Sequence, residues 1–327
     1  MKWNWKKIRR ILCVLLIAFF YVQAWRFSGK MEKSKDTVLI LMDANPVDAE
    51  QAKAMQEKEK EQETPREFVL WNQKNEVEIE NENLKRTHTA AAVAVAGRSD
   101  LLMKGTARVD EEDKKGCLID EHTAIKLFGN TNVTGLTVNV AGEEKVIRGL
   151  LFDAKDTVLY EAEGKEQKFT NLTVFTGDGA PYYEVRQDFM MRHELEGRFL
   201  RMDLLSWAAR LLCLLIPLLA GGRILAAALG LAFRHRREQA GIWIALGGAA
   251  CFGGLLWMLA LKISLPSDMI PTKWSDFEFW GGLWENWRES FLLLLLTEKQ
   301  RPIQAYVEAF SRTAGCCLAG IVSCFLF

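Results

Sequence analysis

The stretch Gly116–Leu151, GCLIDEHTAIKLFGNTNVTGLTVNVAGEEKVIRGLL, contains the strongest local pattern in the chain. The apolar run Cys117–Ile119 is typical of a short buried strand, and it stops at Asp120. Asp120 can cap a following helix, because its side-chain oxygen can accept hydrogen bonds from the first free amides. Gly129 stands where the left-handed C-cap of that helix belongs. The apolar face of the predicted helix consists of Ala124, Ile125, Leu127 and Phe128.

The second half of the stretch predicts a β-hairpin. Leu136–Val140 alternates with a period of two, residues 141–144 supply a turn that contains glycine, and Lys145–Phe152 runs back as the partner strand. A strand, a helix and a hairpin are therefore expected in direct succession.

This succession resembles the MacB-type periplasmic core domain of ABC transporter permeases. The resemblance is carried by the motif A-x-x-L-F-G, a following glycine and the closing V-I-R-G-L-L. The resemblance implies a structural role for these residues. The matching positions are Asp120, Ala124, Leu127, Phe128, Gly129, Gly135, Gly142, Val146 and Gly149.

The distribution of charge indicates a membrane protein with one large aqueous domain. The chain has 327 residues, room for one or two domains, and its 42 basic and 42 acidic residues cancel. It lacks the basic stripe of nucleic-acid-binding proteins, so no nucleic-acid partner is expected. Residues 28–200 are highly charged, whereas 204–261 and 303–327 are strongly apolar.

No motif for catalysis or for a cofactor is present in the sequence. It contains no G-x-x-x-x-G-K-[ST] phosphate loop, no H-E-x-x-H and no G-x-S-x-G, so we expect no enzyme and no ATPase in this chain. Cys117 is the one cysteine of the aqueous part, which predicts neither a disulfide framework nor a CxxC metal site. Residues 120–122 (Asp-Glu-His) carry ligand-type side chains, but neighbours in a helix point to different faces and capping explains the acids. We therefore expect neither a metal ion nor a cofactor.

The N-terminal segment, residues 1–27, is predicted to hold the first transmembrane helix. Basic residues precede the apolar run Ile11–Trp25, which places the N-terminus in the cytoplasm by the positive-inside rule. Residues 22–24 also match a signal-peptidase site, but the aromatic outer end of the run favours an uncleaved helix. Trp3–Arg10 can lie along the inner membrane surface.

Residues 28–200 are predicted to form an extracytoplasmic α+β domain, inserted between the first and second of about four transmembrane helices. Two small split α/β lobes are favoured over a single core. Helices are expected at Val47–Glu63 and Tyr183–Arg201. Strands are expected at Thr37–Met42, Phe68–Trp71, Glu76–Glu80, Thr89–Ala96, Thr157–Glu161 and Phe169–Phe175, beside those of the quoted stretch.

Residues 201–327 are predicted to contain transmembrane helices 2–4. Helix 2 is expected at Leu205–Leu225, with residues 226–233 bent onto the inner surface, helix 3 at Ala240–Leu261 and helix 4 at Ile303–Phe327. Between helices 3 and 4, residues 274–296 form a tryptophan-rich segment that we expect in the outer interface. Four intramembrane charges can line a polar path, although snorkelling at helix ends is simpler: Arg210, Arg223, Glu308 and Arg312.

The order of one helix, an outer domain and three more helices resembles the MacB/FtsX-type permeases. This resemblance implies a subunit in the plasma membrane that forms homo- or heterodimers and recruits a cytoplasmic ABC ATPase. It also implies that ATP hydrolysis by the partner moves the outer domain, for export or extraction of a peptide or lipid-like substrate. The short loop 234–239 supplies the candidate ATPase contacts, which can equally be orientation charges: Arg234, His235, Arg236, Arg237 and Glu238.

A second function stays open at this stage. The chain can be a non-transporting envelope sensor or regulator whose outer domain binds and switches a partner such as a cell-wall hydrolase. An enzyme anchored by its C-terminal helices is a third class, but no residue constellation in the sequence supports it.

Overall fold

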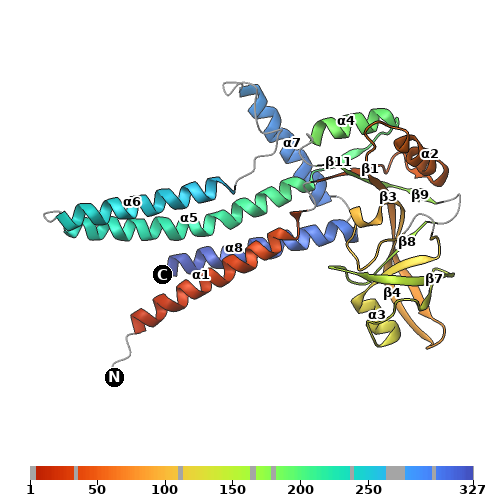
Figure 1. Cartoon of the computed structure of the whole chain (residues 1–327), viewed down its shortest axis with the longest axis horizontal. Coiled ribbons are helices and arrows are strands. Elements are labelled where there is room, and N and C mark those ends of the chain that lie inside the picture. Colours follow the sequence, from red (N-terminus) through yellow and green to blue (C-terminus); the bar gives the residue numbers. More distant parts are fainter. Residues whose placement is uncertain are drawn as a thin grey trace. The chain divides into compact units, whose positions relative to one another are not determined.

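The chain divides into two compact units in a computed structural model (Figure 1). The structure describes residues 5–32, 36–109, 113–162, 167–177, 182–235, 239–262, 277–296 and 300–326. The helical unit comprises Met1–Lys33, Asp203–Ile270 and Tyr306–Phe327, and the α/β unit comprises Ser34–Met202 and Pro271–Ala305.

The helices are α1 (Trp5–Gly29), α2 (Ala49–Lys60), η2 (Ser99–Leu101), α3 (Glu121–Phe128), α4 (Tyr182–Arg192), α5 (Met202–Arg234), α6 (Gln239–Ala260), α7 (Phe277–Leu296) and α8 (Arg301–Leu326). The strands are β1 (Thr37–Leu41), β2 (Val47–Asp48), β3 (Phe68–Asn81), β4 (Arg86–Gly97), β5 (Gly116–Asp120), β6 (Thr137–Val140), β7 (Glu143–Leu151), β8 (Thr157–Glu161), β9 (Lys168–Phe169), β10 (Asn171–Phe175) and β11 (Arg198–Leu200).

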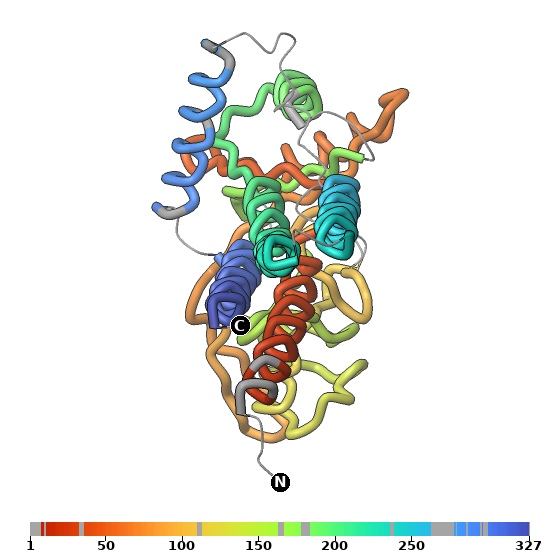
Figure 2. The backbone as a smooth tube through the Cα atoms, turned by 90° about the vertical axis from the view of Figure 1, so that its left-hand side faces the viewer, coloured from red at the N-terminus to blue at the C-terminus, as the bar shows by residue number. Residues whose placement is uncertain are grey.

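Four helices of the described residues are long and apolar enough to cross a membrane: α1 from Ile11 onward, α5, α6 and α8. Within the helical unit, α1, α5 and α8 share a buried cluster that includes Ala24, Cys213 and Cys317. Helix α6 packs on α5 where small residues allow close approach, as at Gly248 beside Ala228. Figure 2 shows these helices end on.

Helix α5 differs from its prediction. It continues as one helix of 33 residues to Arg234, so residues 226–233 do not bend away as expected. Three consecutive alanines at 226–228 favour a helix, and α6 packs alongside at this level, which keeps the backbone helical. Three of the four charges predicted within the membrane are paired: Arg210 contacts Glu32 at 2.5 Å, and Arg312 contacts Glu308 at 3.5 Å.

The α/β unit is built on one nine-stranded mixed sheet with the order β11-β1-β10-β3-β4-β8-β5-β7-β6. An additional pairing of β3 with β6 closes part of this sheet into a barrel-like ring of β3, β4, β8, β5, β7 and β6. The mixed α/β class is therefore confirmed. The long β3–β4 hairpin belongs to both parts, so one continuous sheet connects two separate hydrophobic clusters.

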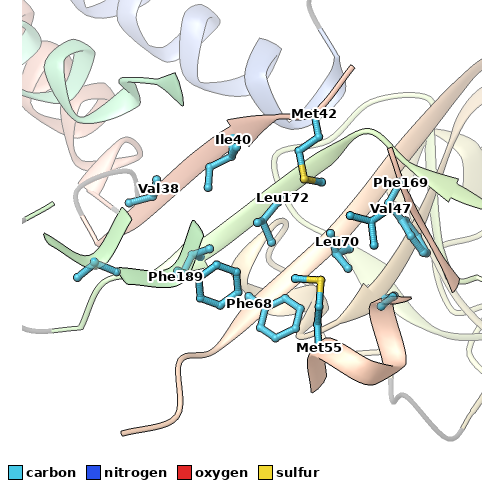
Figure 3. Packing of buried hydrophobic residues seen from close by; sticks show 14 residues of the cluster. Val38, Ile40, Met42, Val47, Met55, Phe68, Leu70, Phe169, Leu172 and Phe189 are labelled. Carbon is cyan, nitrogen blue, oxygen red and sulfur yellow. The ribbon is translucent and has the colours of Figure 1, made fainter. Parts of the chain in front are cut away.

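The first hydrophobic cluster lies on the open part of the sheet, under two helices (Figure 3). Helices α2 and α4 cover one face of β1, β10 and β3, and the rings of Phe68 and Phe189 meet edge to face at 5.3 Å. The largest apolar side chains of this cluster are fully buried, which makes it the main source of hydrophobic stabilisation in this half of the unit. They include Ile40, Met42, Leu70, Phe169, Leu172 and Phe189.

Two further predictions are corrected here. Phe68–Trp71 and Glu76–Glu80 belong to one strand, β3, in which a bulge between Lys74 and Val77 takes up extra residues without ending the pairing. The helix predicted at Tyr183–Arg201 ends at Arg192, and Arg198–Leu200 pairs with β1 instead. Gly197 makes this possible, because a Cβ there would collide with the backbone of β1.

Candidate functional site

The strand, helix and hairpin predicted for Gly116–Leu151 are confirmed as β5, α3, β6 and β7. Asp120 is fully buried and caps α3, accepting hydrogen bonds from the amides of His122 at 2.9 Å and Thr123 at 3.2 Å. It also accepts from the Thr123 hydroxyl at 2.5 Å and from the Thr157 amide at 2.7 Å. Asp120 therefore fastens the start of α3 to both β5 and β8.

The glycines on which the predicted resemblance depends lie at positions with special backbone or space requirements. Gly129 ends α3 in the left-handed conformation with φ 74°, as predicted, and Gly135 and Gly142 also have positive φ values. Gly149 lies where a Cβ would collide with the Thr106 hydroxyl. The fully buried Ala124 and Leu127 pack in the hydrophobic cluster of the barrel-like ring.

The cysteine of the aqueous part belongs to this core. Cys117 lies on β5 and is fully buried, and burial raises the pKa of its thiol to about 12. A thiol with this pKa stays protonated at neutral pH and is not a nucleophile. The structure describes all seven cysteines, and each of them is free.

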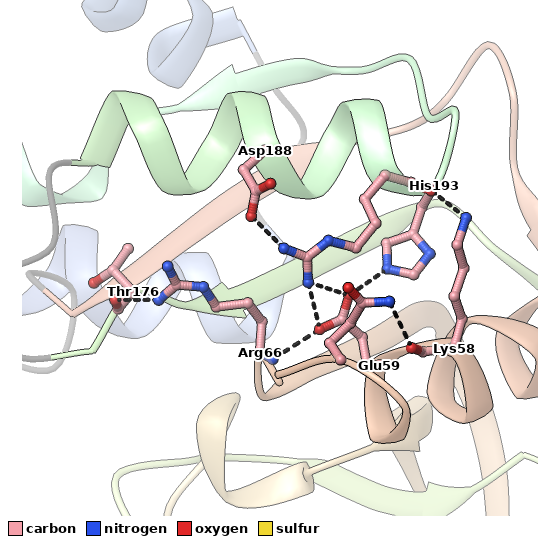
Figure 4. Close-up of polar contacts among 8 residues, drawn as sticks. Lys58, Glu59, Arg66, Thr176, Asp188 and His193 are labelled. Carbon is pink, nitrogen blue, oxygen red and sulfur yellow. Dashed lines mark hydrogen bonds and ion pairs between the residues drawn. The ribbon is translucent and has the colours of Figure 1, made fainter. Parts of the chain in front are cut away.

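A network of ionic contacts joins α2 to the end of α4 (Figure 4). The buried Glu59 carboxylate accepts hydrogen bonds from the Arg66 amide at 2.7 Å, the Arg192 guanidinium at 2.9 Å and the His193 ring at 2.8 Å. Burial by itself would raise the pKa of Glu59, but these donors outweigh it and hold the pKa below its usual value. Burial lowers the pKa of His193.

The sequence analysis did not identify this network. Glu59 lies on a helix that looks solvated in sequence, and its partners Arg192 and His193 are 133 and 134 residues away. A helix rich in Glu and Lys contains no local signal that distinguishes its one buried carboxylate.

A third cluster brings together His88 on β4, His122 in the first turn of α3 and Asp156 in the turn before β8. The Asp156 Oδ1 atom lies 2.8 Å from His88 Nε2 and 2.6 Å from His122 Nδ1. Burial would raise the pKa of Asp156, but the two imidazoles outweigh this and lower it. Of the acidic residues next to His122 in sequence, Asp120 is the helix cap and is not part of the cluster.

The candidate ATPase contacts lie at the end of α5. Arg234 is the last residue of this helix and His235 the exposed turn residue after it, whereas Arg236, Arg237 and Glu238 lie outside the described residues. The predicted inner-surface helix Trp3–Arg10 forms, from Trp5 onward, the first turns of α1. The coupling role of both segments stays a prediction.

No family model matches the sequence, and a comparison with curated proteins finds no match. Among solved structures, the periplasmic region of MacB from Actinobacillus actinomycetemcomitans is similar at a TM-score of 0.41 and 13% identity, over 52% of this chain and 91% of that one. The extracellular domain of YknZ, a noncanonic ABC-type transporter from Gram-positive bacteria, is similar at a TM-score of 0.37 and 16% identity, over 50% and 97%. At these TM-scores and identities, the similarities establish neither the family nor the activity of this chain.

Proposed function

We propose that the chain is the membrane subunit of an ABC transporter, with a separate cytoplasmic ATPase. The observation that carries this proposal is the order of elements along the chain. A candidate membrane helix, α1, comes first, the main segment of the α/β unit, Ser34–Met202, follows, and α5, α6 and α8 come after it. The confirmed strand, helix and hairpin of β5–β7 support the predicted resemblance at the level of local structure.

In this proposal the chain is not an enzyme. ATP hydrolysis is assigned to a partner because the sequence has no phosphate-binding loop. The partner binds the cytoplasmic turn that begins at Arg234, and closure of the partner shifts α5 and α6. These helices pass the shift to the extracytoplasmic α/β unit, which exports or extracts a peptide or lipid-like substrate. Such coupling requires an element with two conformational states. Events at either end of the molecule must shift the equilibrium between these states.

The proposal is tested by purifying the full-length protein from the membranes of its native host in mild detergent. We expect an ATPase with a Walker-type phosphate loop to co-purify and to hydrolyse ATP. Arg234→Glu is expected to abolish this association, because it reverses a charge at the proposed contact. Arg198→Glu is the matched control, since it reverses an exposed arginine of the α/β unit and leaves the association intact.

Two results would contradict the proposal. Absence of any co-purifying ATPase would refute the permease function. Equal loss of the ATPase from both variants would refute the proposed contact at Arg234. If the ATPase is present but no substrate crosses or leaves the membrane in transport assays, the envelope regulator becomes the better assignment.

A further inference from the structure

Two histidines and one aspartate from three separate elements converge at one edge of the barrel-like ring. We propose that His88, His122 and Asp156 form a binding site for a divalent transition-metal ion such as Zn²⁺. Their ligand atoms all lie within 4.8 Å of one another. The site was not expected from the sequence, where 34 residues separate His122 from Asp156 and 68 separate His88 from Asp156. This inference does not depend on the proposed transport function.

The donor atoms select the class of ion. Two imidazole nitrogens and one carboxylate oxygen suit Zn²⁺ and related transition metals, whereas Mg²⁺ and Ca²⁺ prefer sets of oxygen ligands. With metal–ligand distances of about 2.0–2.2 Å, tetrahedral ligand atoms lie roughly 3.3–3.6 Å apart. The two nitrogens now lie 2.8 and 2.6 Å from Asp156 Oδ1, so side-chain rotations that widen these two contacts accompany binding of the ion.

The backbone around the site is held in place by hydrogen bonds that do not involve the ligand atoms. Asp120 accepts from the amide of His122 itself and from the amide of Thr157, the residue after Asp156. The Asp156 carbonyl in turn accepts from the Ala91 amide of β4 at 2.8 Å, three residues from His88. One buried carboxylate and one strand contact thus position all three ligands, as supporting residues do in metal sites.

The site is partly open to solvent. The side chain of His122 is 42% exposed, whereas those of His88 and Asp156 are 18% and 21% exposed. A tetrahedral ion would therefore have three protein ligands and a fourth position for water or for a ligand from a partner. A bound ion would also link β4, α3 and the turn before β8, and so stiffen this side of the ring.

The site is tested on the full-length protein in detergent, carrying an affinity tag without histidine and stripped of metal with a chelator. Titration with Zn²⁺ is expected to show one equivalent bound per chain and a higher thermal unfolding temperature. Co²⁺ is expected to give the visible absorption of a four-coordinate ion, and excess Mg²⁺ is not expected to compete. Asp156→Asn and His122→Gln are each expected to weaken Zn²⁺ binding by at least about tenfold. Even the loss of a residue that only hydrogen-bonds to a metal ligand weakens binding by this much.

The controls match the variants closely. Asp156 has a φ of 48°, a left-handed conformation that asparagine tolerates well, so Asp156→Asn is expected to fold. Asp153→Asn makes the same change in the same loop, also at positive φ, and is expected to bind as the unaltered protein does. If Asp156→Asn fails to fold, comparison of His122→Gln with the unaltered protein decides whether the site binds metal. Failure to bind Zn²⁺ or Co²⁺, or equal binding by the unaltered protein and His122→Gln, would overturn the proposal and leave a hydrogen-bonded His–Asp–His cluster.

Discussion

Replacing Asp120 by alanine is expected to loosen the junction of β5, α3 and β8. The Asp120 side chain is fully buried and accepts hydrogen bonds from the amides of His122, Thr123 and Thr157 and from the Thr123 hydroxyl. An alanine accepts none of these bonds. The first turn of α3 then has no cap, and the Thr157 amide remains buried without its acceptor.

The magnitude follows from these contacts. Loss of an N-cap costs about 1 kcal/mol. A buried donor left without an acceptor costs about 1–3 kcal/mol, and both the Thr157 amide and the Thr123 hydroxyl lose theirs. The sum is about 3–5 kcal/mol after allowing for partial relaxation. Because every 1.4 kcal/mol corresponds to a factor of ten, local opening should become about 100- to 4,000-fold more frequent.

Hydrogen exchange of the full-length protein in detergent measures this opening directly. Peptides that cover α3 and the start of β8 are expected to exchange faster in Asp120→Ala, whereas the helical unit is expected to be unchanged. Glu121→Ala is the matched control, because Glu121 is exposed and its loss should change stability by no more than about 0.5 kcal/mol.

A second substitution of Asp120 gives a finer test. Asp120→Asn keeps one oxygen acceptor and a good capping side chain, so its effect should lie between those of the unaltered protein and Asp120→Ala. Protection of α3 and β8 that is the same in Asp120→Ala as in the unaltered protein would refute the role assigned to this carboxylate.

Three other substitutions test separate parts of the molecule. Glu59→Gln is expected to destabilise the α/β unit by about 3 kcal/mol at neutral pH, because it removes the buried partner of Arg192. Since the folded-state pKa of Glu59 is lowered from its unfolded value, this stabilisation is present at neutral pH. It is lost as the pH falls through the folded-state pKa, where thermal unfolding of the two proteins should converge. Gly149→Ala is expected to cost about 1–3 kcal/mol and to speed exchange of the Leu150 amide, because the new methyl group displaces the Thr106 hydroxyl that accepts from this amide. Lys126→Cys, on the exposed side of α3, is expected to react with a membrane-impermeant maleimide added outside intact cells.

Each of these has a control. Glu57→Gln alters an exposed carboxylate of the same helix, α2, and should leave the unfolding temperature unchanged. Glu144→Ala alters an exposed side chain of the same strand, β7, so it should leave exchange at Leu150 as it is. Arg234→Cys should react only after the membrane is permeabilised. Reaction of Lys126→Cys only after permeabilisation would place the α/β unit in the cytoplasm and contradict the proposed function.

Local and periodic features were predictable from the sequence alone. The cap at Asp120, the left-handed Gly129 and the alternation of Leu136–Val140 depend on neighbours a few residues apart, and the structure has each as expected. The four apolar helices were equally predictable, because a helix that spans a bilayer needs a long run of apolar residues, whichever helices pack against it.

Features that depend on distant partners were decided by the tertiary structure. The edge strand Arg198–Leu200 forms because β1 offers it free hydrogen-bonding groups, and this preference overrides the helical pattern of the preceding residues. The closure of β3 onto β6, the burial of Glu59 against Arg192 and the meeting of His88 with Asp156 join residues from 59 to 133 positions apart. No periodicity encodes such pairs, because they arise only when separate strands and helices pack to bury their apolar faces together.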